Sequence, residues 1–390
     1  MSKVQGYFDP RFESVREVFA EQLNDEQARG AALCVTVGGE TVLDVWGGVV
    51  DKDDSQVWEQ DTLVNVFSAT KPLGAVALLQ LVAAGRIELD APLADVWPEF
   101  AAAGKEAVTL RHVLSHRSGM SAISQTLPPE ALFDWQAMCD ALIAQSPWWS
   151  PGEAHGYAPL TYSWLLGEPL RRLSGQSPGN YVQEHICQPL GMDFFVGAPD
   201  AELSRIAHVS RLRNQFGDDY AKALFMAMGK PEDLPFKAFA NPSSLLTSTN
   251  RVEWQQAQLL AANGSGNARS LARFWQVMAH GGQLDGVKLL DEELVTLMQQ
   301  EHSQGLDRTL RAPTRFGLGV MLEQNYEGGS FGMGANAYGH PGAGGTLGFC
   351  DPDAKVGFGY ATNAMGPYVL MDPRASALSR AVYTALRDLD

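Results

Sequence analysis

The sequence predicts an α+β protein in which an antiparallel sheet, built from both ends of the chain, is flanked by helices and carries a mainly helical insertion. Strand-like runs occur near both termini, helical patterns lie between them, and an amphipathic helix is expected at each end. At 390 residues, 45% hydrophobic and 19% charged, the chain suits one large or two joined domains. We expect residues 1–85 and 300–390 to form the sheet domain and residues 86–299 the mainly helical domain.

The first part of the sheet is predicted from a helix followed by a hairpin. Apolar residues recur at helical spacing between residues 10 and 24, which predicts an amphipathic helix packed on a flat surface. Residues 32–37 and 40–46 read as two strands, joined by Gly38-Gly39. A pair of glycines suits a tight turn, because such a turn needs positive φ.

A buried helix is predicted from about residue 68 to residue 84. In the run 73–84 the single polar side chain is Gln80, so the helix has no polar face and should lie inside a large protein. Pro72 is tolerated in a first turn, and Gly85 is typical of a C-terminal cap. The run is too short to span a bilayer, which needs roughly 20 apolar residues.

Helical segments fill the middle of the chain, and strands return near its end. The predicted helices are residues 109–116, 134–145, 160–173 with a kink at Pro169, 180–188 and 271–280. The predicted strands are residues 316–322, 346–350 and 356–361. A final helix carries Leu378, Val382, Leu386 and Leu389 on one face.

The net charge, the N-terminus and the spacing of the cysteines limit the partners and the cellular location that we expect. A formal net charge of -16 argues against nucleic acid as a partner and leaves no polybasic patch for a membrane surface. The N-terminus lacks an apolar stretch of signal-peptide length, so we expect a cytoplasmic protein. The four cysteines are scattered without Cys-x-x-Cys spacing, which favours free, mostly buried thiols.

Ser68 and Lys71 are the first candidates for chemistry. They lie three residues apart where the buried helix begins, so hydroxyl and amine share one face. The spacing alone occurs about once by chance in a chain this long. A cation at the positive end of a helix dipole is, however, unfavourable unless something requires it.

Metal and cofactor sites are not expected. His112 and His116 have the spacing of zinc ligands, but Val113 stands where a zinc protease needs Glu and no third ligand is indicated. No glycine-rich phosphate loop follows a strand and opens a helix. We therefore predict no metal and no cofactor.

Three further segments strengthen the prediction that Ser68 and Lys71 belong to an active site. They are Leu114 to Met120, Trp148 to Gly167 and Tyr338 to Gly345. Together with Ser68-Ala69-Thr70-Lys71, and in this order, they resemble the motifs of the serine β-lactamase and penicillin-binding-protein superfamily, specifically the family VIII carboxylesterases. The resemblance spans about residues 31–365, and an ordered set of motifs is far more specific than any one of them.

The resemblance implies a β-lactamase/DD-peptidase-like fold with the active site in the groove between the sheet and the helical region. It implies Ser68 as nucleophile, Lys71 as its neighbouring base and Tyr157 as the catalytic tyrosine. His340 and Gly342 match the third motif, and Ala343 would join Ser68 in supplying N–H groups to an oxyanion hole. Serine attacks a carbonyl only after losing its proton, and Lys or Tyr accepts it only if the pKa is tuned. Which of the two takes the proton stays open at this point.

Two departures from the lactamase pattern shift the expected substrate toward a neutral ester. Pro159 stands where the second motif carries an Asn that holds the substrate's amide. His340, with an ordinary pKa of about 6.5, replaces the Lys cation that binds a substrate carboxylate. Pro341, which lacks an N–H, suits an edge strand. Trp148 and Trp149 are candidates for the wall of an acyl pocket, although buried packing explains them equally well.

The sequence therefore predicts a serine carboxylesterase that cleaves small-molecule esters through an acyl-enzyme, with water or an acceptor alcohol or amine releasing the acyl group. A β-lactamase or D-Ala-D-Ala carboxypeptidase is the nearest alternative. A non-catalytic scaffold of the same fold is the alternative from another class.

Overall fold

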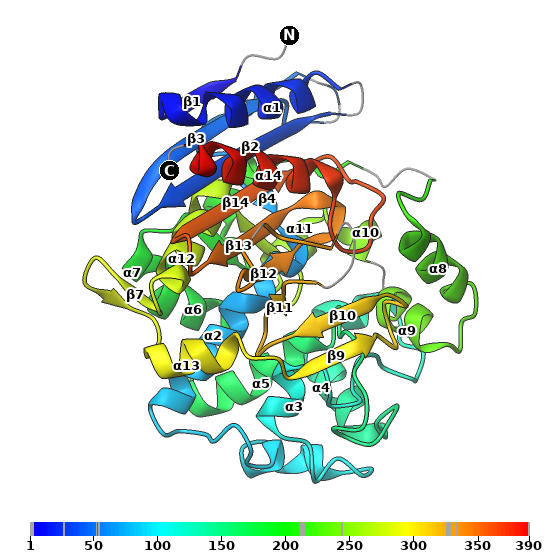
Figure 1. Ribbon diagram of the computed structural model, residues 1–390. Coiled ribbons are helices and arrows are strands. Elements are labelled where there is room, and N and C mark those ends of the chain that lie inside the picture. The colour runs from blue at the N-terminus through cyan, green and yellow to red at the C-terminus, as the bar shows by residue number, and fades with distance from the viewer. Residues whose placement is uncertain are drawn as a thin grey trace.

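The computed structural model describes residues 4–25, 28–51, 53, 55–210, 215–242, 245–324, 329–332 and 334–388. Its main sheet has nine strands: β1 (Gln5–Phe8), β2 (Gly30–Val37), β3 (Glu40–Gly48), β9 (Ser303–Leu306), β10 (Pro313–Phe316), β11 (Met321–Leu322), β12 (Tyr338–Pro341), β13 (Leu347–Asp351) and β14 (Val356–Thr362). They pair antiparallel in the order β1-β3-β2-β14-β13-β12-β11-β10-β9 (Figure 1). The two ends of the chain thus build one sheet, which confirms the predicted fold class.

Helices cover the sheet and fill the region inserted into it. The helices are α1 (Glu13–Leu23), α2 (Lys71–Ala83), α3 (Leu110–Leu114), α4 (Trp135–Ala144), α5 (Tyr162–Ser174), α6 (Pro178–Val182), α7 (Gln188–Leu190), α8 (Asp219–Ala227), α9 (Leu234–Ala240), α10 (Leu245–Ser248), α11 (Val252–Gln256), α12 (Ala268–Ala279), α13 (Glu292–Met298) and α14 (Pro373–Arg387). A small second sheet has the order β4 (Val64–Asn65), β6 (Gly264–Gly266), β5 (Phe194–Val196), and β7 (Gln283–Leu284) pairs with β8 (Val287–Lys288).

The two faces of the main sheet are covered by helices from different parts of the chain. Helices α1 and α14 pack together over one face, where Leu33 and Val35 of β2 join their core (Figure 1). Helix α12 packs on β14, β13 and β2 at the other face, on the side of Ala32 and Cys34. Alternate side chains of a strand point to opposite faces, so β2 is buried on both sides. The division into domains at residues 86 and 299 stays a prediction, since α12 comes from the stretch between them yet packs on the sheet.

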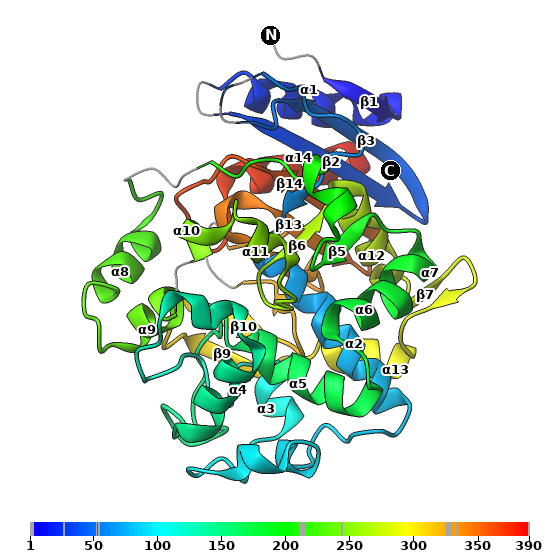
Figure 2. The same cartoon turned by 180° about the vertical axis from the view of Figure 1, so that it is seen from behind.

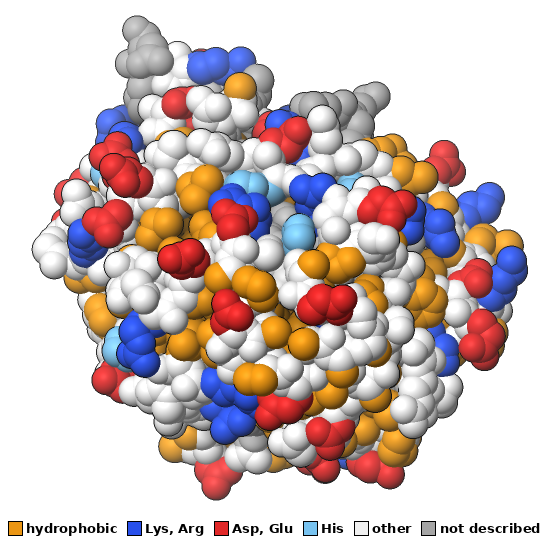
Figure 3. All heavy atoms as spheres, turned by 90° about the horizontal axis from the view of Figure 1, so that it is seen from below, with side chains coloured by type: hydrophobic (Ala, Val, Ile, Leu, Met, Phe, Trp, Pro, Cys, Tyr) orange, Lys and Arg blue, Asp and Glu red, His pale blue; other side chains and the backbone are white. Residues whose placement is uncertain are grey.

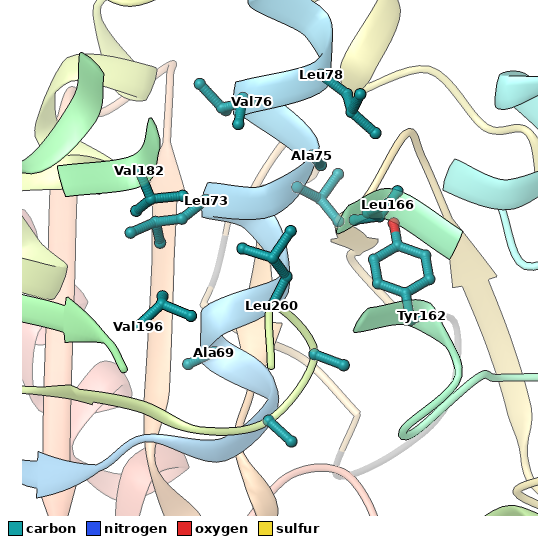
Figure 4. Close-up of a cluster of buried hydrophobic side chains, with 14 of the residues drawn as sticks. Ala69, Leu73, Ala75, Val76, Leu78, Tyr162, Leu166, Val182, Val196 and Leu260 are labelled. Atoms are coloured by element: carbon teal, nitrogen blue, oxygen red, sulfur yellow. The ribbon is translucent and has the colours of Figure 1, made fainter. Parts of the chain in front are cut away.

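Helix α2 runs through the interior, as its all-apolar sequence predicts. Figure 2 shows it beside α5 and α6, and Figure 4 shows apolar side chains surrounding it, including Tyr162, Val182 and Leu260. Gly85 has a φ of 65°, the left-handed conformation of a helix C-terminal cap. The predicted start needs a correction, because residues Phe67–Thr70 form a tighter 3-10 turn and the α-helix begins at Lys71.

The sheet differs from prediction in three places. Residues 316–322 are not one strand, because the chain turns between β10 and β11 with Gly319 at a φ of 77° against Ala75. Strands β1, β9 and β10 have no predicted counterpart. Strand β12 is interior rather than an edge, since it pairs with both β11 and β13. Its end at His340 and Pro341 nevertheless extends past the short β11 and pairs with β13 alone, which explains why a proline is tolerated there.

Other predictions concern the turns and the cysteines. Gly38 and Gly39 have φ values of 60° and 99° in the hairpin turn, as predicted. All four cysteines are free and buried, also as predicted. Leu389 of the predicted final helix lies outside the described residues. Within the described ranges, no helix has both the length and the apolar character required to span a bilayer. On the face shown in Figure 3, acidic and basic side chains are interspersed.

Candidate active site

Ser68 lies in a strained turn that the surrounding fold holds in place. The preceding residue, Phe67, has a φ of 49°, a conformation that is unfavourable for a bulky side chain. The hydroxyl of Thr70 donates to the Phe67 carbonyl at 2.6 Å and accepts from the Gly264 N–H at 2.9 Å. This second contact ties the turn to the small sheet, so Ser68 is presented by a backbone geometry that long-range contacts maintain.

Lys71 is fully buried beside Ser68. Its Nζ lies 3.3 Å from Ser68 Oγ and donates to the carbonyls of Pro159 at 3.3 Å and Ala261 at 2.8 Å. No carboxylate forms an ion pair with it in the part of the chain that the structure describes. Burial without a counter-ion lowers the pKa of Lys71 well below its ordinary value, so the neutral amine is favoured.

Tyr157 packs against the same amine. Lys71 Nζ lies 4.5 Å from the centroid of the Tyr157 ring, and the Tyr157 side chain is buried. Burial raises the pKa of the Tyr157 phenol, and a hydrogen bond with Ser68 acts in the opposite direction. The structure thus brings Ser68, Lys71 and Tyr157 together, as predicted, with a phenol that keeps its proton at neutral pH.

Asp307 fixes the backbone at Tyr157, and the sequence analysis missed it. Its carboxylate accepts the Tyr157 N–H at 3.1 and 3.0 Å and the N–H groups of Thr309 and Leu310, both at 2.8 Å. The side chain is fully buried, at the turn between β9 and β10. In turns, an Asp side chain commonly accepts the backbone N–H two residues further on, as Asp307 does here from Thr309. Nothing in the local sequence indicates that this carboxylate also reaches residue 157.

We expect Asp307→Asn to lower kcat/KM for a short ester about tenfold, mostly through kcat, because the amide NH₂ cannot accept the hydrogen bonds that one carboxylate oxygen accepts now. The measurement is steady-state kinetics well below the unfolding temperature. Asp351→Asn is the matched control, since Asp351 is also buried and accepts the N–H groups of Asp353 and Ala354 away from the site. Equal kinetic losses in both variants would show that Asp307 has a general structural role only.

The third motif lies directly against the Ser68 turn. A Cβ added to Gly342 would lie 2.3 Å from the Val66 carbonyl oxygen, so only glycine allows this approach. His340 Nδ1 donates to the Pro341 carbonyl at 2.7 Å, which leaves Nε2 as a bare acceptor without a hydrogen-bond partner among the described residues. Burial is the main cause that lowers the pKa of His340 to about 3. The ring is therefore neutral at physiological pH.

A cavity of about 340 Å³ opens onto these groups. Ser68, Tyr157, His340 and Ala343 lie at its wall, and the rest is mainly apolar: Pro159, Phe216, Ala221, Leu224, Phe225, Met228, Phe239, Leu310, Met321, Pro341, Met365, Pro367, Tyr368, Val369 and Leu370. Gln215, Gly344 and Gly366 complete it. No described residue at this wall carries a charged side chain. The site suits a neutral, apolar ligand.

Trp148 and Trp149 are not among the described residues of the cavity wall, so of the two alternatives that the sequence left open, the acyl-pocket wall is wrong and buried packing is confirmed. They pack with Ala122, Leu234 and Ala238 in a small separate cluster. Trp148 Nε1 donates to the Ala122 carbonyl at 2.9 Å, which turns the ring into this cluster. Phe239 contacts the same cluster and reaches the cavity wall, so the tryptophans lie behind the wall.

The two histidines of the apparent zinc spacing have structural roles. His116 Nδ1 accepts the N–H of Ala158 at 3.2 Å, beside Tyr157. His112 Nδ1 accepts the N–H of Thr109 at 3.3 Å and closes a capping box at the start of α3. Both rings thus satisfy backbone donors.

Comparison with known proteins places this site in a family. The β-lactamase family model matches residues 15–381. The esterase/β-lactamase LipL of Mycobacterium tuberculosis is 32% identical over 374 residues, which cover 95% of this chain and 85% of LipL. The structure of a penicillin-binding-protein homologue from Caulobacter crescentus is similar with a TM-score of 0.89, at 36% identity over 98% of this chain and 100% of the homologue. A family VIII carboxylesterase structure gives a TM-score of 0.87, at 32% identity over 98% of this chain and 100% of the esterase. The chain belongs to the β-lactamase family.

Proposed function

We propose that this protein is a serine esterase that hydrolyses neutral carboxylic esters through an acyl-enzyme on Ser68. The observation that carries the proposal is the fully buried Lys71 amine, 3.3 Å from the hydroxyl of Ser68, which in turn lines an apolar cavity. The names of two relatives support it, since one is called an esterase/β-lactamase and the other a family VIII carboxylesterase.

Lys71 is the better candidate for the base. A neutral amine has two N–H groups and one lone pair. The carbonyls of Pro159 and Ala261 take the two N–H groups, which leaves the lone pair for the Ser68 hydroxyl. Tyr157 is less suited to accept the proton first, because burial raises its pKa and keeps the phenol protonated. We propose instead that the phenol, which hydrogen-bonds with Ser68 and borders the cavity, passes a proton to the leaving group.

In the first half-reaction Ser68 Oγ bonds to the ester carbonyl carbon while its proton moves to Lys71 Nζ. The N–H groups of Ser68 and Ala343 would stabilise the oxyanion. The C–O bond to the alcohol then breaks, and the alcohol leaves with a proton relayed from Lys71 through Tyr157. In the second half-reaction water attacks the acyl-enzyme, gives its proton to the same base, and releases the carboxylic acid while Ser68 recovers its hydrogen.

An ester fits this site better than a β-lactam or a peptide carboxylate. β-Lactam and peptide substrates carry a carboxylate that needs a cation, and no described residue of the cavity wall supplies a cation. His340 is neutral because its pKa is lowered to about 3. Pro159 contributes a carbonyl to Lys71 in place of a side-chain amide for the substrate.

We expect kcat/KM for p-nitrophenyl butyrate to exceed that for nitrocefin at least 100-fold, and mass spectrometry to find the acyl group on Ser68. β-Lactamase activity is the second candidate, favoured by the name of the Mycobacterium tuberculosis relative. Faster turnover of nitrocefin than of any simple ester would establish it instead. Failure of a fluorophosphonate probe to label Ser68 would indicate a non-catalytic scaffold.

A further inference from the structure

We infer that helix α8 is the binding wall for a large apolar group of the ester, so that esters with an alkyl chain of about eight carbons are preferred over acetates. The inference rests on the proposed esterase function and names the substrate class of that same site. The chain could belong to either the acyl or the alcohol side of the ester, and the two sides share one chemistry: a neutral hydrocarbon next to the scissile carbonyl.

One face of α8 is directed at the cavity instead of at a core. Ala221, Leu224 and Phe225 of α8 and its C-cap residue Met228 occupy positions i, i+3, i+4 and i+7, which lie on one face of a helix. All four line the cavity. No residue of α8 is buried. An apolar face of this kind is normally buried against other elements. Here it borders the space that Ser68 also borders.

Contacts at both ends hold α8 over the cavity. On its N-terminal side the Gly217 N–H donates to the Pro367 carbonyl at 2.8 Å, and the Asp218 carboxylate caps the helix by accepting the Ala221 N–H at 2.6 Å. On its C-terminal side α9 is anchored by the buried residues Leu234 and Ala238. Figures 1 and 2 both show α8 at the periphery of the molecule. The helix is thus anchored beyond its ends, and its apolar face borders the cavity.

The exposed apolar surface continues the same wall. Phe216 is 47% exposed and Phe225 is 55% exposed, and their ring centroids lie 5.0 Å apart. Exposed apolar patches beside a cavity are typical of ligand-binding sites. Both rings line the cavity, so a hydrocarbon chain that starts at the Ser68 carbonyl can cover them.

The experiment compares kcat/KM within two pairs of esters. p-Nitrophenyl octanoate against p-nitrophenyl acetate tests the acyl side, and octyl acetate against ethyl acetate tests the alcohol side. Wild-type protein is expected to prefer the eight-carbon member in at least one pair, since each buried methylene changes the ratio up to about fourfold. Leu224→Ser and Phe225→Ser are expected to lower that preference at least fivefold. Met226→Ser is the matched control on the same helix, because Met226 is 68% exposed and does not line the cavity, and it should shift the ratio less than twofold.

Three results would overturn the inference. One is a wild-type preference for the two-carbon member in both pairs. Another is an unchanged ratio in both Leu224→Ser and Phe225→Ser while the short esters are still cleaved, which rejects the role of α8 and leaves the proposed function standing. The third is absence of turnover of all four esters by wild-type protein, which rejects the proposed function and this inference with it.

Discussion

Ser68→Ala lowers kcat/KM for p-nitrophenyl butyrate by at least about 10⁴-fold, as expected when the nucleophile of an acyl-transfer enzyme is removed. Among the described residues, Ser68 Oγ is the one hydroxyl that hydrogen-bonds to Lys71 Nζ, and the other partners of Nζ are the backbone carbonyls of Pro159 and Ala261. Steady-state hydrolysis measures the loss. Mass spectrometry of the fluorophosphonate-treated variant should show no adduct.

Ser379→Ala is the matched control for this loss. Ser379, on α14, is also a buried serine and does not line the cavity. Its Oγ donates to the Phe331 carbonyl at 2.5 Å. Its kcat/KM should stay within twofold of wild type. Hydrolysis by Ser68→Ala within tenfold of wild type would reject Ser68 as the nucleophile.

Lys71→Met lowers kcat/KM about 10³-fold, within the range that a positioned general base contributes. The pH profile gives the more specific test. In the wild-type protein kcat/KM should rise with pH through the ionisation of Lys71, and this acid limb should lie well below the ordinary pKa of 10.5, since burial lowers the pKa of this amine. The residual activity of Lys71→Met should lack that limb. A limb that persists unchanged in the variant would assign it to another group.

The same substitution is expected to raise thermal stability. The unfolded chain holds the proton on Lys71 up to an ordinary pKa of 10.5, whereas the folded protein releases it at lower pH. Between these two pKa values the unfolded state binds more protons, so the wild-type protein gains stability as pH rises. The unfolding temperature of Lys71→Met should therefore exceed that of wild type at neutral pH, by a margin that shrinks toward pH 10.5. A lower unfolding temperature in the variant would contradict this account.

Lys105→Met controls for the loss of a buried amine as such. Lys105 is buried and donates to the carbonyls of Ala102, Ile143 and Gln145 at 2.5, 2.9 and 2.5 Å. It has no partner at the candidate active site. We expect kcat/KM of this variant to stay within twofold of wild type, which would separate the role of Lys71 from a general effect of removing a buried lysine.

Local patterns predicted the parts of the fold that depend on neighbours along the chain. Gly38-Gly39 predicted the hairpin turn because positive φ is a property of the residues themselves. The apolar run after Lys71 predicted a buried helix because the lack of a polar face can also be read from consecutive residues. The prediction of one strand over residues 316–322 was wrong, because an alternation of glycine and apolar residues also suits the tight turn that packs Gly319 against Ala75 of α2.

The parts that depend on distant residues were not predictable in this way. Asp307 reaches Tyr157 across 150 positions in the sequence, and no local pattern records that contact. The apolar spacing of α8 is visible in the sequence, but the same spacing also fits a helix buried against a core. For Trp148 and Trp149 the sequence left two alternatives open, because large aromatic side chains suit both a pocket wall and a packed cluster.

By itself, the sequence determined the α+β class, the family resemblance and the pairing of Ser68 with Lys71, because spacing on one helical turn is a local property. Only the tertiary structure decided which protonation state that pair favours. The carbonyls of Pro159 and Ala261 approach Lys71 from 88 and 190 positions away, and no carboxylate does so among the described residues. Desolvation and hydrogen bonding set the pKa of a buried amine. Both depend on which distant segments the fold brings together.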